Sequence, residues 1–240
     1  MRRYAAALFC LLMLQATQPV AAAIVDASQY DAFWLWSGVR PQPVLAQARS
    51  LYILQGQISQ QRYSHDPTAR FIAQGPAVPK GKQGEIWLSY RAQTLDWNPQ
   101  VYASLLAQLQ RWQRGGNALY GIQIDFDART RHLDEYLVFL RDLRQRLPKE
   151  YRLSITGLLD WSAHADPLVL NQLRGVVDEI VIQTYQGRQT IANYPAYLPQ
   201  VSRLQLPFKI GLLQHGEWQA PAYLADSPWF RGYVVFLQNP

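Results

Sequence analysis

Two aspartates that stand two residues apart offer the clearest chemistry in this sequence. Asp125 and Asp127 lie in the stretch Leu119–Ala128, LYGIQIDFDA, which has the composition of a β-strand. Because side chains alternate along a strand, Gln123, Asp125 and Asp127 share one face. Carboxylates are rarely buried without a partner, so this face is expected to meet water, a ligand or a partner. Two carboxylates this close also raise the pKa of one of them, as a general acid at neutral pH requires.

Strand and helix patterns alternate on both sides of this strand. Apolar and aromatic runs predict further strands over 30–36, 50–58, 85–92, 152–161, 179–185, 207–216 and 232–238. Helical spacing of apolar residues, bounded by Pro and Gly, predicts helices over 98–114, 133–147, 166–175 and 194–201. The Pro- and Gly-rich stretch 60–84 reads as irregular or hairpin-like.

Eight strands separated mostly by helices favour parallel pairing, because right-handed crossovers connect parallel strands economically. The simplest closed arrangement is a compact (β/α)8 barrel of the TIM type, one domain over residues 24–240. About 217 residues (240 − 23) is near the lower limit of roughly 200 for this fold, so some helices must be short or missing. An open, doubly wound sheet is the alternative. No glycine-rich phosphate loop occurs, so no cofactor is expected.

The first residues have the pattern of a secretory signal peptide. A basic start, Met1–Tyr4, precedes a short apolar run over 5–14 and small residues up to Ala23. The apolar run is shorter than the roughly 20 residues of a membrane-spanning helix, so we expect cleavage near Ala23 and no membrane anchor afterwards. The protein is then periplasmic or secreted. The only cysteine, Cys10, lies inside this segment, and the mature chain would contain no thiol.

The charge pattern argues against nucleic acid as a partner. The formal net charge of +6 falls to about +4 when Arg2 and Arg3 leave with the signal peptide (6 − 2), and the other arginines are scattered without a basic run. The four histidines are widely spaced, so no metal site is expected. No Gly-x-Ser-x-Gly elbow is present, which argues against an esterase. We expect a monomer.

Polar and aromatic residues recur where the predicted strands end. In a barrel these ends meet at one mouth, where active sites are built. Carboxylates and amides bind sugar hydroxyls, and flat aromatic faces support sugar rings. The expected partner is therefore an oligosaccharide or polysaccharide. The candidate site residues are Asp125, Asp127 and Tyr185, to which the resemblance described below assigns catalytic roles, and Gln57, Gln123, Gln183, Gln214, Gln238, Asp160, Trp36 and Trp161 for substrate binding.

The central strand resembles a known signature. Gly121–Asp127 is similar to the fourth-strand motif of the family-18 chitinases, Asp-Gly-x-Asp-x-Asp-x-Glu. Tyr120 and Gln123 stand where that family has aspartates, and Asp127 stands where it has its acid glutamate. Gln183-Thr184-Tyr185 resembles that family's sixth-strand Met-x-Tyr segment, and Lys209–Leu212 its seventh-strand lead-in.

A second resemblance covers nearly all of the mature chain. From Tyr30–Trp34 through Gln123–Asp127 the sequence is similar to a bacterial family known only as domain of unknown function 3142. This resemblance supplies no activity.

The chitinase resemblance implies a glycosidase whose substrate's own acetamido group acts as the nucleophile. In that scheme Asp127 is the acid, Asp125 orients the acetamido group and Tyr185 supports its oxygen. The sequence departs from the family because Asp is one methylene shorter than Glu, a loss of roughly 1 Å in reach, and such displacements slow enzymes on the order of a hundredfold. Gln123 also replaces a charge that would help to cycle the proton.

Three interpretations remain open. In the first the chain is a glycoside hydrolase for a β-linked polysaccharide, with or without N-acetyl groups, and in the second it is a non-catalytic carbohydrate-binding protein on a degenerate barrel. In a third, purely structural interpretation, Asp125 and Asp127 form a buried ion-pair cluster with Arg91 or Arg129.

Overall fold

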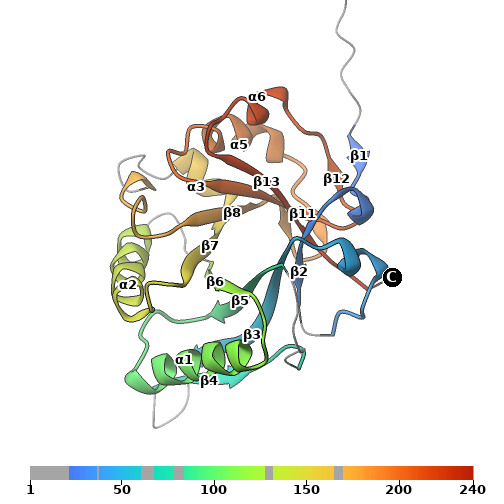
Figure 1. Cartoon of the computed structure of the whole chain (residues 1–240). Helices are drawn as coiled ribbons and strands as arrows, with labels where there is room; N and C mark the ends of the chain where they lie inside the picture. The colour runs from blue at the N-terminus through green and yellow to red at the C-terminus, as the bar shows by residue number, and fades with distance from the viewer. Residues whose placement is uncertain are drawn as a thin grey trace, which may run out of the picture.

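The structure is a computed structural model that describes residues 22–36, 38–60, 68–77, 84–127, 132–164 and 170–239. Strands converge at the centre of the molecule, and helices lie around them (Figure 1). The predicted signal peptide lies almost wholly outside the described residues. The same holds for Arg129 and for the start of the helix predicted over 166–175.

Eight strands form a closed ring in which neighbouring strands are parallel. In chain order they are β2 (Ala32–Leu35), β3 (Ser50–Gln60), β5 (Glu85–Ala92), β6 (Leu119–Asp125), β7 (Arg152–Leu158), β8 (Glu179–Gln183), β11 (Phe208–Leu213) and β13 (Phe230–Phe236). The ring closes at β2, which pairs with β13 on one side and with β3 on the other. The predicted barrel is therefore confirmed, and the sheet is not open.

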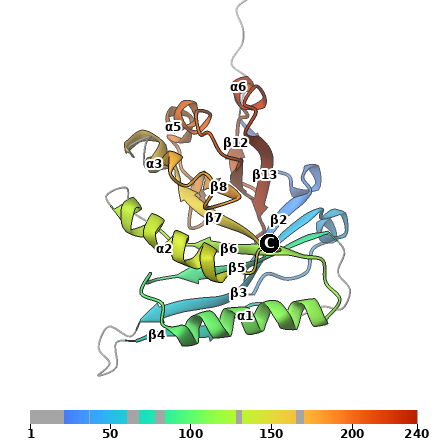
Figure 2. The ribbon, with the colours of Figure 1, turned by 60° about the vertical axis from the view of Figure 1, so that its left-hand side comes forward.

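The helices pack on the outside of this ring, as Figure 2 also shows. They are α1 (Pro99–Arg114), α2 (Leu133–Arg146), α3 (Leu159–His164), α5 (Tyr194–Val201) and α6 (Ala222–Ala225). In the described residues no α-helix follows β2 or β3. The chain there uses the 3-10 turn η2 (Pro43–Gln47) and the strand β4 (Ala69–Ala73), which pairs antiparallel with β3. The expectation of short or missing helices is confirmed.

Short strands and a 3-10 turn lie at the two ends of the barrel. A 3-10 turn, η1 (Ala27–Gln29), follows β1 (Ala23–Ile24), which pairs with β12 (Glu217–Trp218). At the carboxyl end of β8, the strands β9 (Tyr185–Gln186) and β10 (Gln189–Thr190) form a hairpin. This hairpin brings Tyr185 and its neighbours over the mouth of the barrel.

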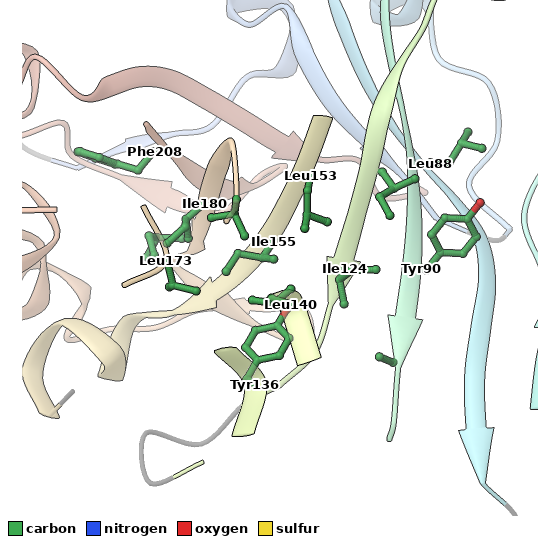
Figure 3. Close-up of a cluster of buried hydrophobic side chains, with 14 of the residues drawn as sticks. Leu88, Tyr90, Ile124, Tyr136, Leu140, Leu153, Ile155, Leu173, Ile180 and Phe208 are labelled. Atoms are coloured by element: carbon green, nitrogen blue, oxygen red, sulfur yellow. The ribbon is translucent and has the colours of Figure 1, made fainter. Parts of the chain in front are cut away.

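Alternation along β6 separates the two faces of the barrel wall. Ile122 and Ile124 belong to the core between the wall and the helices, where Figure 3 shows Ile124 near Tyr136 and Leu140 of α2. Gln123, on the opposite face, bonds to side chains of other barrel strands. The same alternation places Asp125 on the interior face, at the end of the strand.

The fifth barrel strand ends earlier than its sequence predicts. The pattern over 152–161 predicts a strand as far as Trp161, whereas β7 ends at Leu158 and α3 begins at Leu159. Trp161 therefore lies on a helix, where it is buried in the core and contacts Tyr136 edge-on at 6.2 Å. The prediction assigned the strand from apolar alternation alone, which does not distinguish a strand end from a helix start.

Candidate functional site

A cleft of about 690 Å³ opens at the carboxyl ends of the barrel strands. Six of the predicted site residues line it, and each comes from the end of a strand or from the segment just after it. They are Trp36 after β2, Asp125 and Asp127 at β6, Asp160 after β7, and Gln183 and Tyr185 at β8. The cleft therefore brings together all three of the residues predicted for catalysis.

Asp125 lies at the base of this cleft and is only 8% exposed. Its Oδ1 accepts a hydrogen bond of 2.9 Å from the Thr156 hydroxyl on the neighbouring strand β7. The pKa of Asp125 is raised to about 6, because burial and, less strongly, the charge of Asp127 raise it by more than the Thr156 hydrogen bond and Arg91 lower it. The raised pKa thus belongs to the buried member of the pair. Asp125 can change its protonation state near neutral pH.

Asp127 and Asp160 place two more carboxylates around the same cleft. Asp127, two residues after Asp125, is exposed to solvent. Asp160 lies in the first turn of α3. An exposed carboxyl at the edge of an open cleft can reach a bound molecule directly. Arg91 lies near Asp125 but forms a salt bridge with neither Asp125 nor Asp127. Arg91 therefore does not support the interpretation of the two aspartates as a structural ion-pair cluster.

Tyr185 contributes a buried hydroxyl that has no hydrogen-bond partner among the described residues. Its side chain is 8% exposed and lines the cleft. Gln183 approaches this hydroxyl without completing a hydrogen bond, and burial together with the charge of Asp125 holds the pKa of Tyr185 well above its usual range. Because a buried hydroxyl without a partner is costly, this group is suited to donate to a ligand.

Aromatic side chains form the opposite wall of the cleft. Trp36 packs against Phe236 with ring centroids 5.8 Å apart, and Phe236 in turn contacts Tyr185 at 5.5 Å. Arg91, from the end of β5, lies 5.6 Å from the Trp36 ring. Tyr197 of α5 also lines this wall. Partly exposed aromatic rings beside carboxylates and amides match what sugar binding requires.

A second hollow of about 610 Å³ adjoins the cleft. The two share Arg91, Asp125 and Asp127, and the second continues along Gln60 and Thr94. The carboxylate pair therefore stands between two hollows, so a chain-like ligand can pass over it.

Gln123 does not line either hollow, because it is buried in the barrel interior at 1% exposure. Its amide oxygen accepts hydrogen bonds from Trp34 Nε1 at 2.6 Å and Ser89 Oγ at 3.2 Å, and its amide nitrogen donates to Ser154 Oγ at 3.0 Å. These bonds use both acceptor positions of the amide oxygen and one of the two N–H donors of the amide nitrogen. The structure gives Gln123 a supporting position beneath Asp125 and not a place in the lining of the cleft.

Four other predicted binding residues lie outside the cleft lining. Trp161 is in the core, as described above. Gln57 pairs in register with Arg91 but accepts from Gln74 Nε2 at 3.3 Å. Gln214 exchanges hydrogen bonds with Gln42 and accepts from the Gln238 backbone N–H at 2.8 Å.

A β-bulge in β3 explains why Gln55 and Gln57 do not share a face, although simple alternation along the strand would predict that they do. The pairing of β3 with β5 shifts register between Leu54 and Gly56. Gln55 consequently faces α1, where its Oε1 accepts from Trp112 Nε1 at 2.9 Å, and it does not share a face with Gln57. Simple alternation cannot anticipate this extra residue.

The sequence prediction missed Tyr197 and Phe236 as cleft residues. Phe236 stands two residues before Gln238 on the last strand, so the same alternation that selected Gln238 could have found it. Tyr197 comes from a helix that reaches over the mouth, and nothing in the local pattern marks it.

The described part of the chain lacks the features of a metal site and of a membrane-spanning helix. Within those residues no group of three or more His, Cys, Asp or Glu side chains could hold a metal ion. No helix found there has the length and apolar character to cross a bilayer.

Fold and site together define a barrel of the TIM type with an acidic and aromatic cleft at the carboxyl ends of its strands. A family model described as "Domain of unknown function (DUF3142)" matches residues 86–191, which include β6 and the Gln183–Tyr185 segment. The resemblance to that family is thereby confirmed over residues 86–191, a shorter stretch than the resemblance predicted from Tyr30 onward. No curated protein matches the chain.

Several solved structures are similar to this one. The spore cortex-lytic enzyme SleL of Bacillus cereus is 19% identical with a TM-score of 0.49, over 76% of this chain and 49% of its own. The chain thus spans about half the length of SleL. The chitinase domain of the spore coat protein CotE from Clostridium difficile is 15% identical with a TM-score of 0.48, over 85% of this chain and 68% of its own.

A third similar structure is that of a protein named as an enzyme inhibitor. The xylanase and alpha-amylase inhibitor protein XAIP-II of Scadoxus multiflorus is 13% identical with a TM-score of 0.52, over 86% of this chain and 92% of its own. At this identity the likeness shows the fold alone.

Proposed function

We propose that the chain is an exported glycoside hydrolase that cleaves a β-linked, N-acetylated polysaccharide. One observation carries the proposal: Asp125, Asp127 and Tyr185 line a single open cleft with aromatic walls. The basic and apolar start of the sequence supports export.

The geometry supports a role for each group. Asp127, exposed at the edge of the cleft, donates a proton to the leaving glycosidic oxygen. Asp125 is mostly ionised above pH 6 and accepts the N–H of the substrate's acetamido group. The Tyr185 hydroxyl donates to the acetamido oxygen, which needs a hydrogen-bond donor as it attacks the anomeric carbon. The bond to the leaving sugar breaks as the proton from Asp127 arrives, and water later opens the cyclic intermediate.

The test is product release from a panel of β-linked oligosaccharides, with and without N-acetyl groups, measured by mass spectrometry. We expect the wild-type chain to cleave the acetylated members and Asp127→Asn to lose at least a hundredfold in kcat/KM, because it removes the proton donor.

The matched control is Asp226→Asn, which makes the same change of charge at an exposed aspartate that does not line the cleft. It should retain wild-type kcat/KM. Equal activity of wild type and Asp127→Asn would show that the proposed acid is wrong.

A non-catalytic sugar-binding protein is the second candidate function. Asp127 is the shorter acid at the position where the chitinases resembled have Glu, and XAIP-II, which has this fold, is named as an inhibitor. If the panel binds equally to wild type and Asp127→Asn and no product appears, this candidate replaces the hydrolase.

A further inference from the structure

Arg91 is the one cationic side chain lining the two adjoining hollows in the described structure. The other charged groups there are the carboxylates Asp125, Asp127 and Asp160. Arg91 lies at the end of β5, in register between Gln57 of β3 and Asp125 of β6, and it lines both hollows. Any ligand that occupies both hollows passes this guanidinium.

The hydrogen-bonding capacity of Arg91 is unused within the described residues. The side chain is exposed, and it makes no hydrogen bond or salt bridge there. Its one close contact is the Trp36 ring, 5.6 Å from the guanidinium carbon. A guanidinium has five N–H donors in a planar fork that matches a carboxylate. Contact with the Trp36 ring restricts the plane of the fork and leaves its edges available.

The surrounding charges restrict where an acidic ligand can be bound. A carboxylate near Asp125, Asp127 or Asp160 is repelled, whereas one on the side of Arg91 away from its register partner Asp125 gains a charge-assisted bond. The formal net charge, +6 for the whole sequence and about +4 after the predicted loss of Arg2 and Arg3 (6 − 2), favours the approach of a polyanion.

On this basis we infer that Arg91 is a specificity residue that binds a carboxylate on an acidic, β-linked polysaccharide in the cleft. The inference rests on the proposed function, because it names the substrate class of the same site.

The ring of strands indicates which sugar bears the carboxylate. Tyr185 follows β8 and Arg91 ends β5, and β7 and β6 lie between these strands. Three strand spacings of about 4.8 Å are about 14 Å along the barrel wall, more than the width of one sugar ring. The carboxylate at Arg91 therefore belongs to a sugar other than the one whose acetamido group lies at Tyr185. A polymer that alternates N-acetylhexosamine and uronic acid satisfies both positions.

The experiment compares one such oligosaccharide with its carboxyl-reduced form, which keeps the backbone and linkage but has no charge. Affinities of wild type, Arg91→Gln and Arg91→Lys for both forms are measured by titration calorimetry at low salt. We expect wild type to bind the acidic form about tenfold more tightly, as charge-assisted bonds predict. The ratio should fall to about one in Arg91→Gln and be partly kept in Arg91→Lys, which retains the charge without the fork.

The control is Arg231→Gln, which removes the same charge from the opposite end of the barrel, at the start of β13. It should keep the tenfold preference, whereas a general effect of net charge would reduce it equally. The preference of wild type should also shrink as salt increases.

Three results would overturn the inference: equal affinity of wild type for the two forms, a preference that survives in Arg91→Gln, or no binding of either form. Failure of the hydrolase proposal looks different, because binding does not depend on turnover. Cleavage that requires Asp127 without a preference for acid refutes only the role of Arg91. A preference that requires Arg91 without any cleavage refutes only the hydrolase.

Discussion

The interior of this barrel contains two polar layers that differ in how their groups are partnered. In the lower layer, Lys209 Nζ donates to the Tyr52 hydroxyl at 2.8 Å, and that hydroxyl donates to Glu179 Oε1 at 2.6 Å. Ser154 Oγ donates to the same carboxylate oxygen at 2.9 Å, and Lys209 lies 3.4 Å from Glu179 Oε2. Each of these side chains has a partner inside the barrel.

The upper layer, at the mouth, is left incomplete. Thr156 donates to Asp125, but the pKa of Asp125 is raised to about 6, and the Tyr185 hydroxyl has no partner in the described structure. Gln123 joins the two layers, since it bonds to Ser154 below and precedes Asp125 by two residues on the same face of β6. The two layers also share strand β7, on which Ser154 of the lower layer and Thr156 of the upper layer stand two residues apart.

The difference shows what polar residues do at the two depths. Groups that satisfy one another in the interior stabilise one arrangement of the barrel strands. Groups that stay unsatisfied at the mouth weaken the empty protein and are available to a ligand. The comparison therefore predicts opposite effects on stability when equivalent groups are removed from the two layers.

The largest effect is expected from Glu179→Gln in the lower layer. The change leaves Lys209 buried without its counter-charge, so the free energy of unfolding should fall by about 3–5 kcal/mol. Urea denaturation measures the loss. Glu150→Gln, at an exposed glutamate before β7, is the control and should change stability by less than about 0.5 kcal/mol. A loss as small as that of the control would mean that the lower layer does not stabilise the barrel.

Asp125→Asn in the upper layer should raise the free energy of unfolding, and only at pH values at which Asp125 of the wild type is ionised. Because burial raises the folded pKa to about 6, the wild type binds this proton more tightly when folded, and it loses stability as pH rises from about 4 to 6. Asn cannot ionise and can still accept from Thr156. The variant should therefore be more stable by about 2–3 kcal/mol at pH 7 and equal to wild type near pH 3.5.

Urea denaturation at both pH values checks this prediction. Asp226→Asn should show no such pH-dependent gain, since that aspartate is exposed. A gain for Asp125→Asn that is the same at both pH values would indicate repacking and not the ionisation of Asp125.

The sequence predicted the barrel and the position of the mouth because both follow from periodicity. The strands from β2 to β13 have clear apolar alternation, and parallel strands place their carboxyl ends at one edge. Asp125, Asp127 and Tyr185 could therefore be placed at the mouth from the sequence. The missing helix after β3 was predicted as well, because the Pro- and Gly-rich stretch 60–84 reads as hairpin-like, and β4 pairs antiparallel with β3.

The sequence could not predict which polar residues are satisfied by others. Gln123 and Asp125 have the same parity on β6, yet Gln123 is bonded to Trp34, a residue 89 positions away. Such pairing depends on the diameter of the ring and on rotamers, which local patterns do not contain. The helix that begins at Leu159 removes Trp161 from the mouth for a similar reason, because the point at which a strand ends depends on packing.

The smallest effects on stability are expected from Tyr52→Phe and Tyr185→Phe, each of which removes only a hydroxyl. Tyr52→Phe removes one group that accepts from Lys209 and donates to Glu179, so the free energy of unfolding should fall by about 1–3 kcal/mol. Tyr185→Phe removes a buried hydroxyl without a described partner, so stability should stay the same or rise by up to about 1 kcal/mol. Urea denaturation of both variants measures the two changes.

For sugar binding, Tyr185→Phe should have a larger effect than Tyr52→Phe. Tyr185→Phe should weaken binding of an N-acetylated oligosaccharide about tenfold, as the loss of one hydrogen bond to a ligand predicts, while Tyr52→Phe should leave it unchanged. If Tyr185→Phe destabilises the protein as much as Tyr52→Phe does, the Tyr185 hydroxyl has a structural partner. The two layers would then differ in depth alone, and the stability cost of an open site would have to lie with Asp125.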